Sequence, residues 1–474
     1  MSRTGPKTKK QKLAAKKSGA VVLLDSPLCP DLTDAASVEA LRKQYDASTP
    51  YTHLVLRDFC LPQRMRLIHE EAKQTMVTTF KETDLFKVYQ TGDLGAIDPM
   101  MAQCLPQLMA LRTAIYSSEF RQFVCGITGL EGLTDRVDCS ANAYVQGCHL
   151  LCHDDVIGTR RVSYIIYLTD PDDAWEATDG GALELYGLED SSVLDRGAAF
   201  GGQQGVPQVS PSANILPLFN SMALFVVQPG RSYHSVQEVF VDKPRLSISG
   251  WYHGNGPPAG ADQASLSQII QKGDDTRPFE ALPALPPAVH GEPEGTDGLG
   301  LTADELAELA LLVNPAYLQP ACMAQIKARF CEDNSVQLRD FLRADAAHTL
   351  LEVCVQADED SALGGERAPE SYEVATSQEW RAVGPPHKRR HLLYAPTSSP
   401  ASSSSPASSS SAAARAGAQL FALAQGLFRS RAFLRLVEAL TTLRPTGCRG
   451  DVRRFRPGLD YTVAHAGSMT QVRI

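Results

Sequence analysis

The sequence predicts an α+β protein whose central domain is a sandwich or jelly roll of short strands, with helical segments on both sides. Between about residues 138 and 252 the chain alternates β-branched runs with turns that contain Gly, Pro or Asp, a pattern typical of such folds. Before this region, and again after residue 300, apolar residues recur at helical spacing. The candidate strands are 138–145, 161–168, 181–186, 221–227, 234–240 and 245–252.

The predicted helices flank this strand region. Pro62 begins one run at helical spacing, and a second run spans residues 106–123. Beyond the strands, residues 302–305 have the composition of a capping box at the start of a helix. One more amphipathic helix, over residues 420–440, and a lone strand over 460–465 complete the prediction.

Composition sets the boundaries between segments. Residues 396–411 contain ten Ser and three Pro, so they cannot form a packed core, and residues 272–300 are rich in Pro, Gly and acid, as linkers are. The predicted organisation is a basic tail (1–20), a catalytic domain (50–255), a linker (272–300), a helical region (301–395), a Ser/Pro/Ala low-complexity segment (396–417) and a C-terminal domain (418–474).

The N-terminal tail is strongly basic although the chain has a net charge of −9. Seven basic residues and no acid lie between Arg3 and Lys17. Such a segment repels itself and favours a nuclear-import arm or a contact with RNA or the ribosome. The alternative is a solvated terminus that has no partner.

Cysteine usage and hydropathy bear on the compartment. The 11 cysteines are odd in number, scattered, and include no C-x-x-C pair, so no disulfide framework is expected. No apolar run approaches the ~20 residues of a membrane helix, and we expect no membrane association. The prediction is a protein of the cytoplasm and the nucleus.

The central motif is an H-x-D pair, His153 and Asp155, followed by His234. Two imidazoles and one carboxylate can hold an octahedral iron on one side and leave adjacent positions open for a co-substrate and dioxygen. On extended backbone, side chains two apart share one face, so His153 and Asp155 are expected to point inward and Asp154 outward.

A candidate anion site follows the motif. Arg245 stands eleven residues after His234, and a guanidinium there can hold a distal carboxylate by two parallel hydrogen bonds. The alternation along the strand does not show whether the Arg245 side chain points into the barrel. Leu246 and Ile248 would occupy the core face of the strand, and Arg245 would lie on the opposite face.

A zinc site is an alternative for the same segment. Cys148-His149 and Cys152-His153 supply the sulfur and imidazole ligands that zinc prefers. On one strand these side chains would not converge, and no other Cys/His pair lies nearby in the sequence, so zinc is disfavoured.

Longer strings around these residues resemble the ribosomal prolyl 3-hydroxylase family. The resemblance covers residues ~50–255 and continues more weakly through 314–317 and 338–342. The strings that carry it are LCHDD at 151–155, RRVSYIIYL at 160–168, GGALELY at 180–186 and RLSISGWYHG at 245–254.

The resemblance implies a double-stranded β-helix that uses Fe(II), 2-oxoglutarate and O2, with L-ascorbate as a further candidate cofactor. It implies hydroxylation of a prolyl residue in the small-subunit ribosomal protein at the decoding centre, with an influence on translation. The implied metal ligands, which are also the catalytic residues, are His153, Asp155 and His234, and the implied 2-oxoglutarate-binding residues are Arg245, Tyr167 and Tyr144. Both tyrosines could instead be core aromatics. Residues 85–94 resemble the family's substrate-covering segment.

The chain departs from the family pattern near its end. Members carry a second, non-catalytic β-helix domain, and residues 460–465 resemble only its opening strand, so a truncated second β-helix is expected. His465-Ala-Gly467 lacks the carboxylate of an H-x-D motif, so no second iron site is expected. A competing hypothesis is a catalytically silent β-helix scaffold that binds a ribosomal or RNA partner; the intact triad and Arg245 argue against it.

Overall fold

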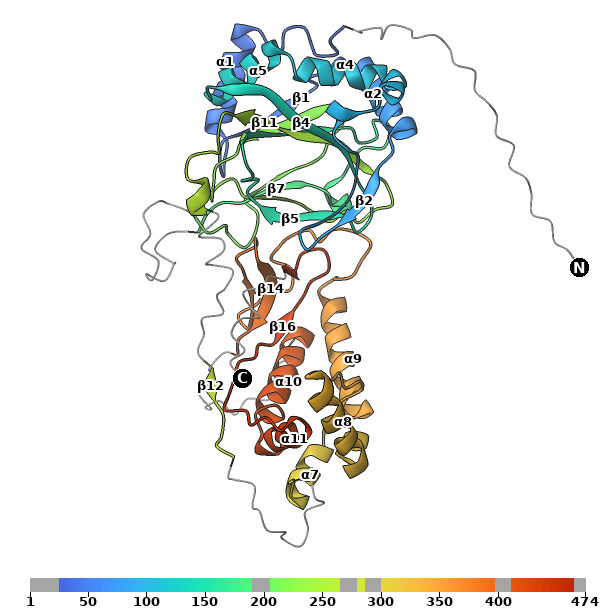
Figure 1. Cartoon of the computed structure of the whole chain (residues 1–474), viewed down its shortest axis with the longest axis vertical. Coiled ribbons are helices and arrows are strands. Elements are labelled where there is room, and N and C mark those ends of the chain that lie inside the picture. Colours follow the sequence, from blue (N-terminus) through green and yellow to red (C-terminus); the bar gives the residue numbers. More distant parts are fainter. Residues whose placement is uncertain (1–24, 190–204, 265–278, 286–299, 397–410, 464–474) are drawn as a thin grey trace, which may run out of the picture.

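A curled sheet under a cap of helices forms the upper part of the molecule, and an elongated second domain lies below it (Figure 1). The computed structural model describes residues 25–189, 205–264, 279–285, 300–396 and 411–463. The predicted basic tail and most of the predicted linker lie outside these residues, as does His465.

The sheet has eleven strands, all paired antiparallel, in the order β1-β9-β6-β11-β4-β3-β5-β10-β7-β8, with β2 paired to β3. It curls so that β5 and β7 lie across the interior from β4 and β11 (Figure 1). The predicted double-stranded β-helix is therefore confirmed. The strands are β1 (His53–Arg57), β2 (Thr79–Glu82), β3 (Phe86–Gln90), β4 (Leu133–Tyr144), β5 (His149–His153), β6 (Arg160–Tyr167), β7 (Leu183–Leu185), β8 (Ala213–Ile215), β9 (Ser221–Val226), β10 (His234–Val236) and β11 (Arg245–Gly254).

All six strands expected from sequence are present, and two of the strands that sequence missed, β2 and β5, have a weak β pattern. β2 is exposed along its whole length, so it has no apolar alternation to detect. β5 consists of His, Leu and Cys, which have no β-branch. Pairing with neighbours in the sheet, rather than local propensity, makes these segments strands.

The helices cover the outer face of one half of the sheet. Leu108 and Phe120 of the cap share a core with Ile166 of β6 and Leu224 of β9. The run expected over 106–123 is two helices, because the Ser117 hydroxyl accepts from the Phe120 amide and starts a new one. The helices of this domain are α1 (Ala35–Ala47), α2 (Pro62–Thr75), η1 (Leu94–Ala96), α3 (Pro99–Gln103), α4 (Pro106–Ile115), α5 (Ser118–Thr128) and η2 (Ala177–Asp179).

The second domain combines helices with a small sheet. The side chain of Thr302 accepts from the Glu305 amide and Glu305 reaches back, so the predicted capping box is present. Strand β14 lies at the centre of the small sheet, between β13 and β16, and also pairs with β17. The elements are β12 (Glu280–Ala281), α7 (Ala303–Ala310), η3 (Pro315–Leu318), α8 (Pro320–Asp333), α9 (Ala344–Asp360), β13 (Trp380–Val383), β14 (Arg389–Tyr394), α10 (Ala412–Gly426), α11 (Arg431–Thr441), β15 (Gly447–Cys448), β16 (Arg453–Arg454) and β17 (Tyr461–Thr462).

Several predictions for this region were wrong. The segment over 301–395 is helical only to Asp360, because Gly, Pro and Ser follow and the chain then forms β13 and β14. The strand predicted over 460–465 is present as β17, but it is not lone, because it pairs with β14. That pairing joins the predicted helical region and the predicted C-terminal domain into one unit.

The boundary of the low-complexity segment and the last amphipathic helix also need correction. Residues 412–417 open α10 instead of continuing the low-complexity segment, because Ala favours helix and the Ser411 hydroxyl accepts from the Ala414 amide. The single helix expected over 420–440 is divided between α10 and α11, where Ser430 caps the second helix.

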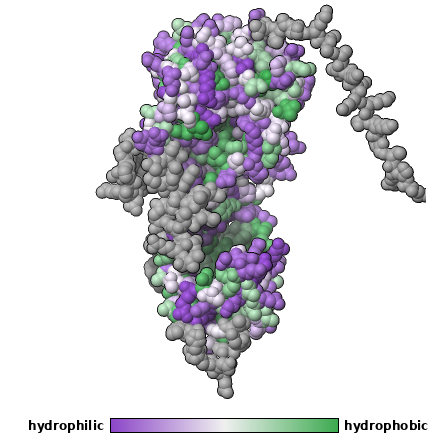
Figure 2. Space-filling view, in the orientation of Figure 1, coloured by the Kyte–Doolittle hydropathy of each residue, from purple (hydrophilic) through white to green (hydrophobic). Residues whose placement is uncertain are grey.

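The polarity of the surface differs between the helical cap and the recess that separates the two domains. On the face shown in Figure 2, polar side chains dominate the helical cap, and apolar ones gather in the recess between the two domains. Within the described ranges, no helix combines the length and the apolar character required to cross a bilayer.

The β4–β11 pairing requires a glycine at position 250. A Cβ on Gly250 would lie 1.7 Å from the backbone oxygen of Asp138. We expect Gly250→Ala to lower the free energy of unfolding by about 3 kcal/mol, because the strands must separate to admit the methyl group. Gly256→Ala is the control, since a Cβ there meets nothing within 4 Å, and its effect should stay within about 0.5 kcal/mol. Urea unfolding measures both; equal midpoints would contradict this packing.

Candidate metal and 2-oxoglutarate site

Three predicted ligands converge inside the barrel. His153 ends β5 and pairs directly with His234, which begins β10. His153 Nε2 lies 3.3 Å from Asp155 Oδ1, and His234 Nε2 lies 3.3 Å from Asp155 Oδ2. One ligand atom from each residue lies within 4.8 Å of the others. The arrangement is that of a facial triad around one ion.

Backbone carbonyls orient both imidazoles. His153 Nδ1 lies 2.8 Å from the Leu151 oxygen, and His234 Nδ1 lies 2.9 Å from the Ser232 oxygen. Each Nδ1–H therefore donates to a carbonyl, which leaves each Nε2, directed at Asp155, as the nitrogen available to a metal. Hydrogen bonds of this kind fix the tautomer that a metal requires.

The backbone conformation that places Asp155 in the site differs from the extended strand that the sequence predicted. The strand ends at His153, and Asp155 lies in a left-handed conformation with φ 60°, so the motif is a strand end followed by a turn. Asp154 is directed away from the ligands, but it is not idle. Its Oδ2 accepts from the Gly230 amide at 3.0 Å, which ties this turn to the loop before His234.

Two residues that sequence reasoning missed hold the carboxylate of Asp155. The Ser163 hydroxyl and the Trp251 indole N–H each donate to Asp155 Oδ2 at 3.0 Å. The Arg160 guanidinium stacks over the Trp251 ring at 3.4 Å and lies 3.6 Å from Asp155 Oδ1. These residues belong to the strings quoted above, but no spacing rule ties them to the triad.

The charges in the site favour an ionised carboxylate. Burial alone would raise the pKa of Asp155, but the charges and hydrogen bonds of His234 and His153 outweigh burial and hold that pKa well below its ordinary value. Burial lowers the pKa of His153, but the hydrogen bond and charge of Asp155 outweigh it and raise this pKa overall. A divalent cation supplies the same countercharge to Asp155 at this point.

Arg245 faces the same cavity as the triad. Along β11, Arg245, Ser247 and Ser249 line the cavity. Leu246 and Ile248 belong to the core beneath the helical cap, which settles the direction that the sequence left open. Arg245 is 1% exposed, and its buried Nη2 has no hydrogen-bond partner among the described residues. A buried guanidinium N–H of this kind is suited to a carboxylate.

Nearby backbone and aromatic groups hold the guanidinium in place. Its Nε donates to the Gly181 oxygen at 2.6 Å, and a Cβ at Gly181 would lie 2.9 Å from Arg245 Cδ. Its Cζ lies 5.1 Å from the ring centre of Tyr144 and 5.1 Å from that of Tyr167. These contacts orient the guanidinium and leave Nη2 as the group to be satisfied.

The two predicted tyrosines have different positions. Tyr144 lines the cavity, whereas Tyr167 is fully buried beside Arg245 and does not line it. The Tyr167 hydroxyl has no hydrogen-bond partner among the described residues. Burial raises the pKa of each tyrosine to about 12, and Arg245 opposes the rise. Both therefore remain protonated donors near neutral pH.

The cavity joins the triad to Arg245. It encloses about 430 Å³, and five of the six predicted site residues line it. Its lining, from seven strands (β3, β4, β5, β6, β7, β10 and β11) and adjoining loops, is partly apolar and partly polar. Representative lining residues are Leu85, Phe86, Gln90, Asn142, Leu150, Ile157, Ser163 and Trp251.

The zinc alternative is not supported where the structure describes the chain. Cys152 packs with Tyr186 and Tyr233 on the outer side of the sheet, away from His153. The cluster of potential metal ligands found in the described ranges consists of His153, Asp155 and His234, with no cysteine.

Comparisons with known proteins agree with this geometry. The 2OG-Fe(II) oxygenase superfamily profile matches residues 139–253, and the profile described as oxoglutarate and iron-dependent oxygenase degradation C-term matches residues 304–474. Prolyl 3,4-dihydroxylase OGFOD1 of Ostreococcus tauri is 37% identical over 426 residues, which cover 88% of this chain and 76% of that protein.

The chain belongs to the OGFOD1 family of prolyl hydroxylases.

Other relatives are more distant. Within the OGFOD1 family, prolyl 3-hydroxylase OGFOD1 of Xenopus laevis is 31% identical over 352 residues, covering 72% of this chain and 57% of that protein. The chain therefore spans between 57% and 76% of the length of these two relatives. A solved prolyl-4-hydroxylase from Pseudomonas putida is 19% identical, with a TM-score of 0.31 over 46% of this chain and all of that one.

The donor set fits the Fe(II) and 2-oxoglutarate that OGFOD1-family membership implies. Two imidazole nitrogens and one carboxylate suit Fe(II), and the unsatisfied Nη2 of Arg245 suits the far carboxylate of 2-oxoglutarate.

We predict that His153→Ala weakens the binding of Co(II), a redox-stable substitute for Fe(II), by about 100-fold or more, because one of three ligands is lost. Isothermal titration calorimetry on the purified chain measures this affinity. His149→Ala is the matched control, since His149 lies on the same strand and outside the cluster. Co(II) binding of equal strength in both variants would show that the ion binds elsewhere.

Proposed function

We propose that this chain hydroxylates a prolyl residue of a small-subunit ribosomal protein at the decoding centre, and thereby influences translation. The observation that carries the proposal is the buried triad that shares one cavity with an Arg245 guanidinium whose Nη2 is unsatisfied. The family supplies the reaction class, because its relatives are named prolyl 3-hydroxylase and prolyl 3,4-dihydroxylase.

Two sets of residues, at the two ends of the cavity, would bind iron and 2-oxoglutarate. His153, Asp155 and His234 would hold Fe(II), and Arg245 with Tyr144 and Tyr167 would hold 2-oxoglutarate. When bound, iron and 2-oxoglutarate supply the oxidising chemistry that puts one atom of O2 into a C–H bond of the prolyl ring, with succinate and CO2 as co-products. Ser163 and Trp251 would keep the Asp155 carboxylate in one orientation throughout.

The remaining wall of the cavity suits a prolyl ring. Leu85, Phe86 and Ile157 contribute apolar side chains, and Arg160 stacked on Trp251 contributes hydrogen-bond donors beside Asp155. An apolar wall with a few convergent polar groups is typical of small-molecule and side-chain pockets. Segment 85–94, which contains β3, is proposed as the cover that excludes water during the reaction.

The finer features of the function are also proposals. L-ascorbate is proposed as an auxiliary cofactor. The basic tail over residues 1–20 is proposed to contact the ribosome or RNA, and the cytoplasm and nucleus are the proposed compartments.

We expect the purified chain, given Fe(II), 2-oxoglutarate, O2 and a peptide from the decoding-centre ribosomal protein, to release succinate and to add the mass of one or more oxygen atoms to the peptide. Asp155→Ala should abolish both, because it removes the carboxylate ligand. Mass spectrometry and a succinate assay measure the outcome. Peptide binding without succinate would favour the silent scaffold, and normal turnover by Asp155→Ala would contradict the triad.

Arg245→Lys should raise the KM for 2-oxoglutarate by about tenfold or more and change kcat less, because an ammonium cannot form two parallel bonds to a carboxylate. Steady-state kinetics with varied 2-oxoglutarate test this. Arg57→Lys at the exposed end of β1 is the control. An unchanged KM in Arg245→Lys would place the carboxylate elsewhere.

A further inference from the structure

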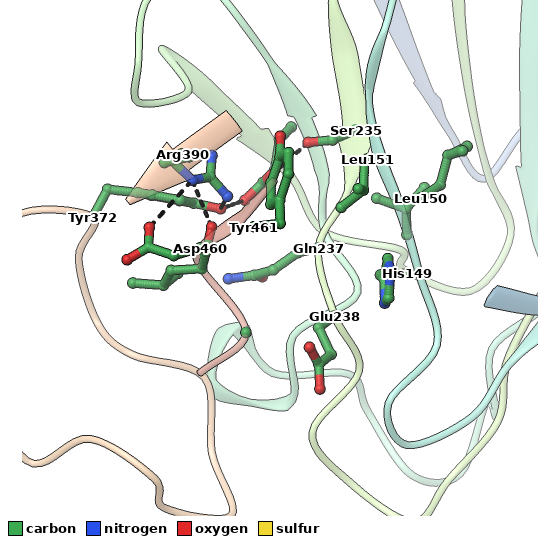
Figure 3. A pocket seen from close by; sticks show the side chains of 14 residues that line it. His149, Leu150, Leu151, Ser235, Gln237, Glu238, Tyr372, Arg390, Asp460 and Tyr461 are labelled. Carbon is green, nitrogen blue, oxygen red and sulfur yellow. Dashed lines mark hydrogen bonds and ion pairs between the residues drawn. The ribbon is translucent and has the colours of Figure 1, made fainter. Parts of the chain in front are cut away.

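Both neighbours of His234 in the chain face the second domain. His234 is directed into the cavity, whereas Tyr233 and Ser235 lie on the outer side of the sheet. The Tyr233 ring stacks on His387 of the second domain, with ring centres 5.4 Å apart. Ser235 lines a small cavity between the domains, together with Arg390 and Tyr461 (Figure 3). The strand that carries a metal ligand is thus contacted from outside on both sides of that ligand.

Ser235 is held by a buried carboxylate. Its hydroxyl donates to Glu184 Oε2 on the adjacent strand β7, and Ser235 and Glu184 are direct partners in the ladder. The Tyr186 hydroxyl donates to the same oxygen at 3.1 Å, and the Tyr372 hydroxyl donates to Oε1. Glu184 is 1% exposed, so these donors take the place of water. One of them, Tyr372, comes from the second domain.

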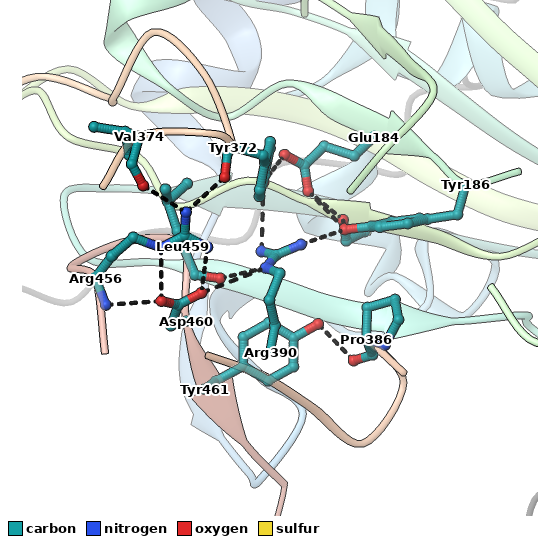
Figure 4. Close-up of polar contacts among 11 residues, drawn as sticks. Glu184, Tyr186, Tyr372, Val374, Pro386, Arg390, Arg456, Leu459, Asp460 and Tyr461 are labelled. Atoms are coloured by element: carbon teal, nitrogen blue, oxygen red, sulfur yellow. Dashed lines mark hydrogen bonds and ion pairs between the residues drawn. The ribbon is translucent and has the colours of Figure 1, made fainter. Parts of the chain in front are cut away.

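Arg390 completes this network from β14. Its Nη1 donates to the Tyr186 hydroxyl at 3.1 Å, and its Nη2 donates to the Tyr372 hydroxyl at 3.4 Å (Figure 4). Each tyrosine therefore accepts from Arg390 and donates to Glu184. Arg390 and Glu184 are thus linked through two hydroxyls, each of which accepts from the guanidinium and donates to the carboxyl group.

The second domain holds Arg390 rigidly. Arg390 Nε donates to the Leu459 oxygen at 2.6 Å and lies 3.9 Å from Asp460 Oδ1. Asp460 is in turn held by Arg456, with Nε at 2.8 Å and Nη2 at 2.9 Å from its two oxygens. Arg456 also donates to the backbone oxygen of Tyr372. The same domain thus fixes both of the groups that reach Glu184.

The network acts on a short strand of the sheet. Strand β10 has three residues, and its register with β5 shifts between His234 and Val236. Few backbone hydrogen bonds therefore determine where His234 lies. A side-chain anchor one residue away can set the orientation of its imidazole, as outer-sphere partners do for metal ligands.

We propose that Arg390 is a positioning residue for the metal site, which acts through Tyr372, Tyr186, Glu184 and Ser235 on His234. This inference rests on the proposed function, because it takes His234 as an iron ligand. It makes the second domain part of the apparatus that holds iron.

Tyr372→Phe and Ser235→Ala test the proposal on the full chain, because each removes one hydroxyl from the network and leaves the triad intact. Co(II) affinity should fall by about tenfold in each variant, and the visible absorption of the bound Co(II) should change, since His234 loses its fixed orientation. In the double variant the losses should not add, because both hydroxyls act through Glu184.

Tyr394→Phe is the matched control. Tyr394 ends β14, the strand that carries Arg390, and its ring packs on Trp380 and Phe421 inside the second domain, so the variant loses one hydroxyl from the same strand without touching Glu184. Its Co(II) affinity and spectrum should equal those of the wild type. If Tyr372→Phe and Ser235→Ala fold and bind Co(II) like this control, the inference is overturned and the proposed function stands. If the wild type binds Co(II) no better than His153→Ala, both the proposed metal site and this inference are contradicted.

Discussion

The close approach of the Asp155 carboxylate to the imidazoles of His153 and His234 is the constraint on which the rest of this structure depends. Asp155 is buried with both histidine Nε2 atoms 3.3 Å from its oxygens, an arrangement that needs a compensating charge and a fixed geometry. The surroundings provide that geometry: carbonyls orient the imidazoles, and Ser163 and Trp251 donate to the carboxylate. Because the ligands come from two paired strands and a following turn, the curled sheet has to form before the site exists.

Because side chains alternate along each strand, the two faces of the sheet have different roles. Along β11, residues of one parity pack beneath the helical cap and residues of the other parity line the cavity, so one strand serves both the core and the site. Because the apolar residues of these strands are buried beneath the helical cap, the opposite face, which lines the cavity, can remain polar. Arg245 is tolerated in that interior because Gly181, Tyr144 and Tyr167 surround it, and its unsatisfied Nη2 would bind a carboxylate of 2-oxoglutarate, the co-substrate that OGFOD1-family membership implies.

The second domain is connected to the first by charge as well as by packing. Arg390 and Glu184, both buried, come from different domains and are joined through the hydroxyls of Tyr186 and Tyr372. Loss of either end of this linkage would leave the other group buried without its hydrogen-bond partners, which is costly. Its position behind β10 explains why a domain that carries no described metal ligand would matter to the metal site.

The sequence by itself determined the chemistry and six of the eleven strands of the main sheet. The spacing of His153, Asp155 and His234, and the later Arg245, predicted which atoms meet, because donor types and period-two alternation are local properties. It did not determine the left-handed turn at Asp155, the roles of Ser163 and Trp251, or the inward direction of Arg245, since these depend on which strands become neighbours. Nor could it assign β5 or the small sheet around β14, where pairing with distant segments outweighs weak local preference. The network from Arg390 to Ser235 joins residues more than 150 positions apart, and only the tertiary structure brings such side chains within hydrogen-bond distance.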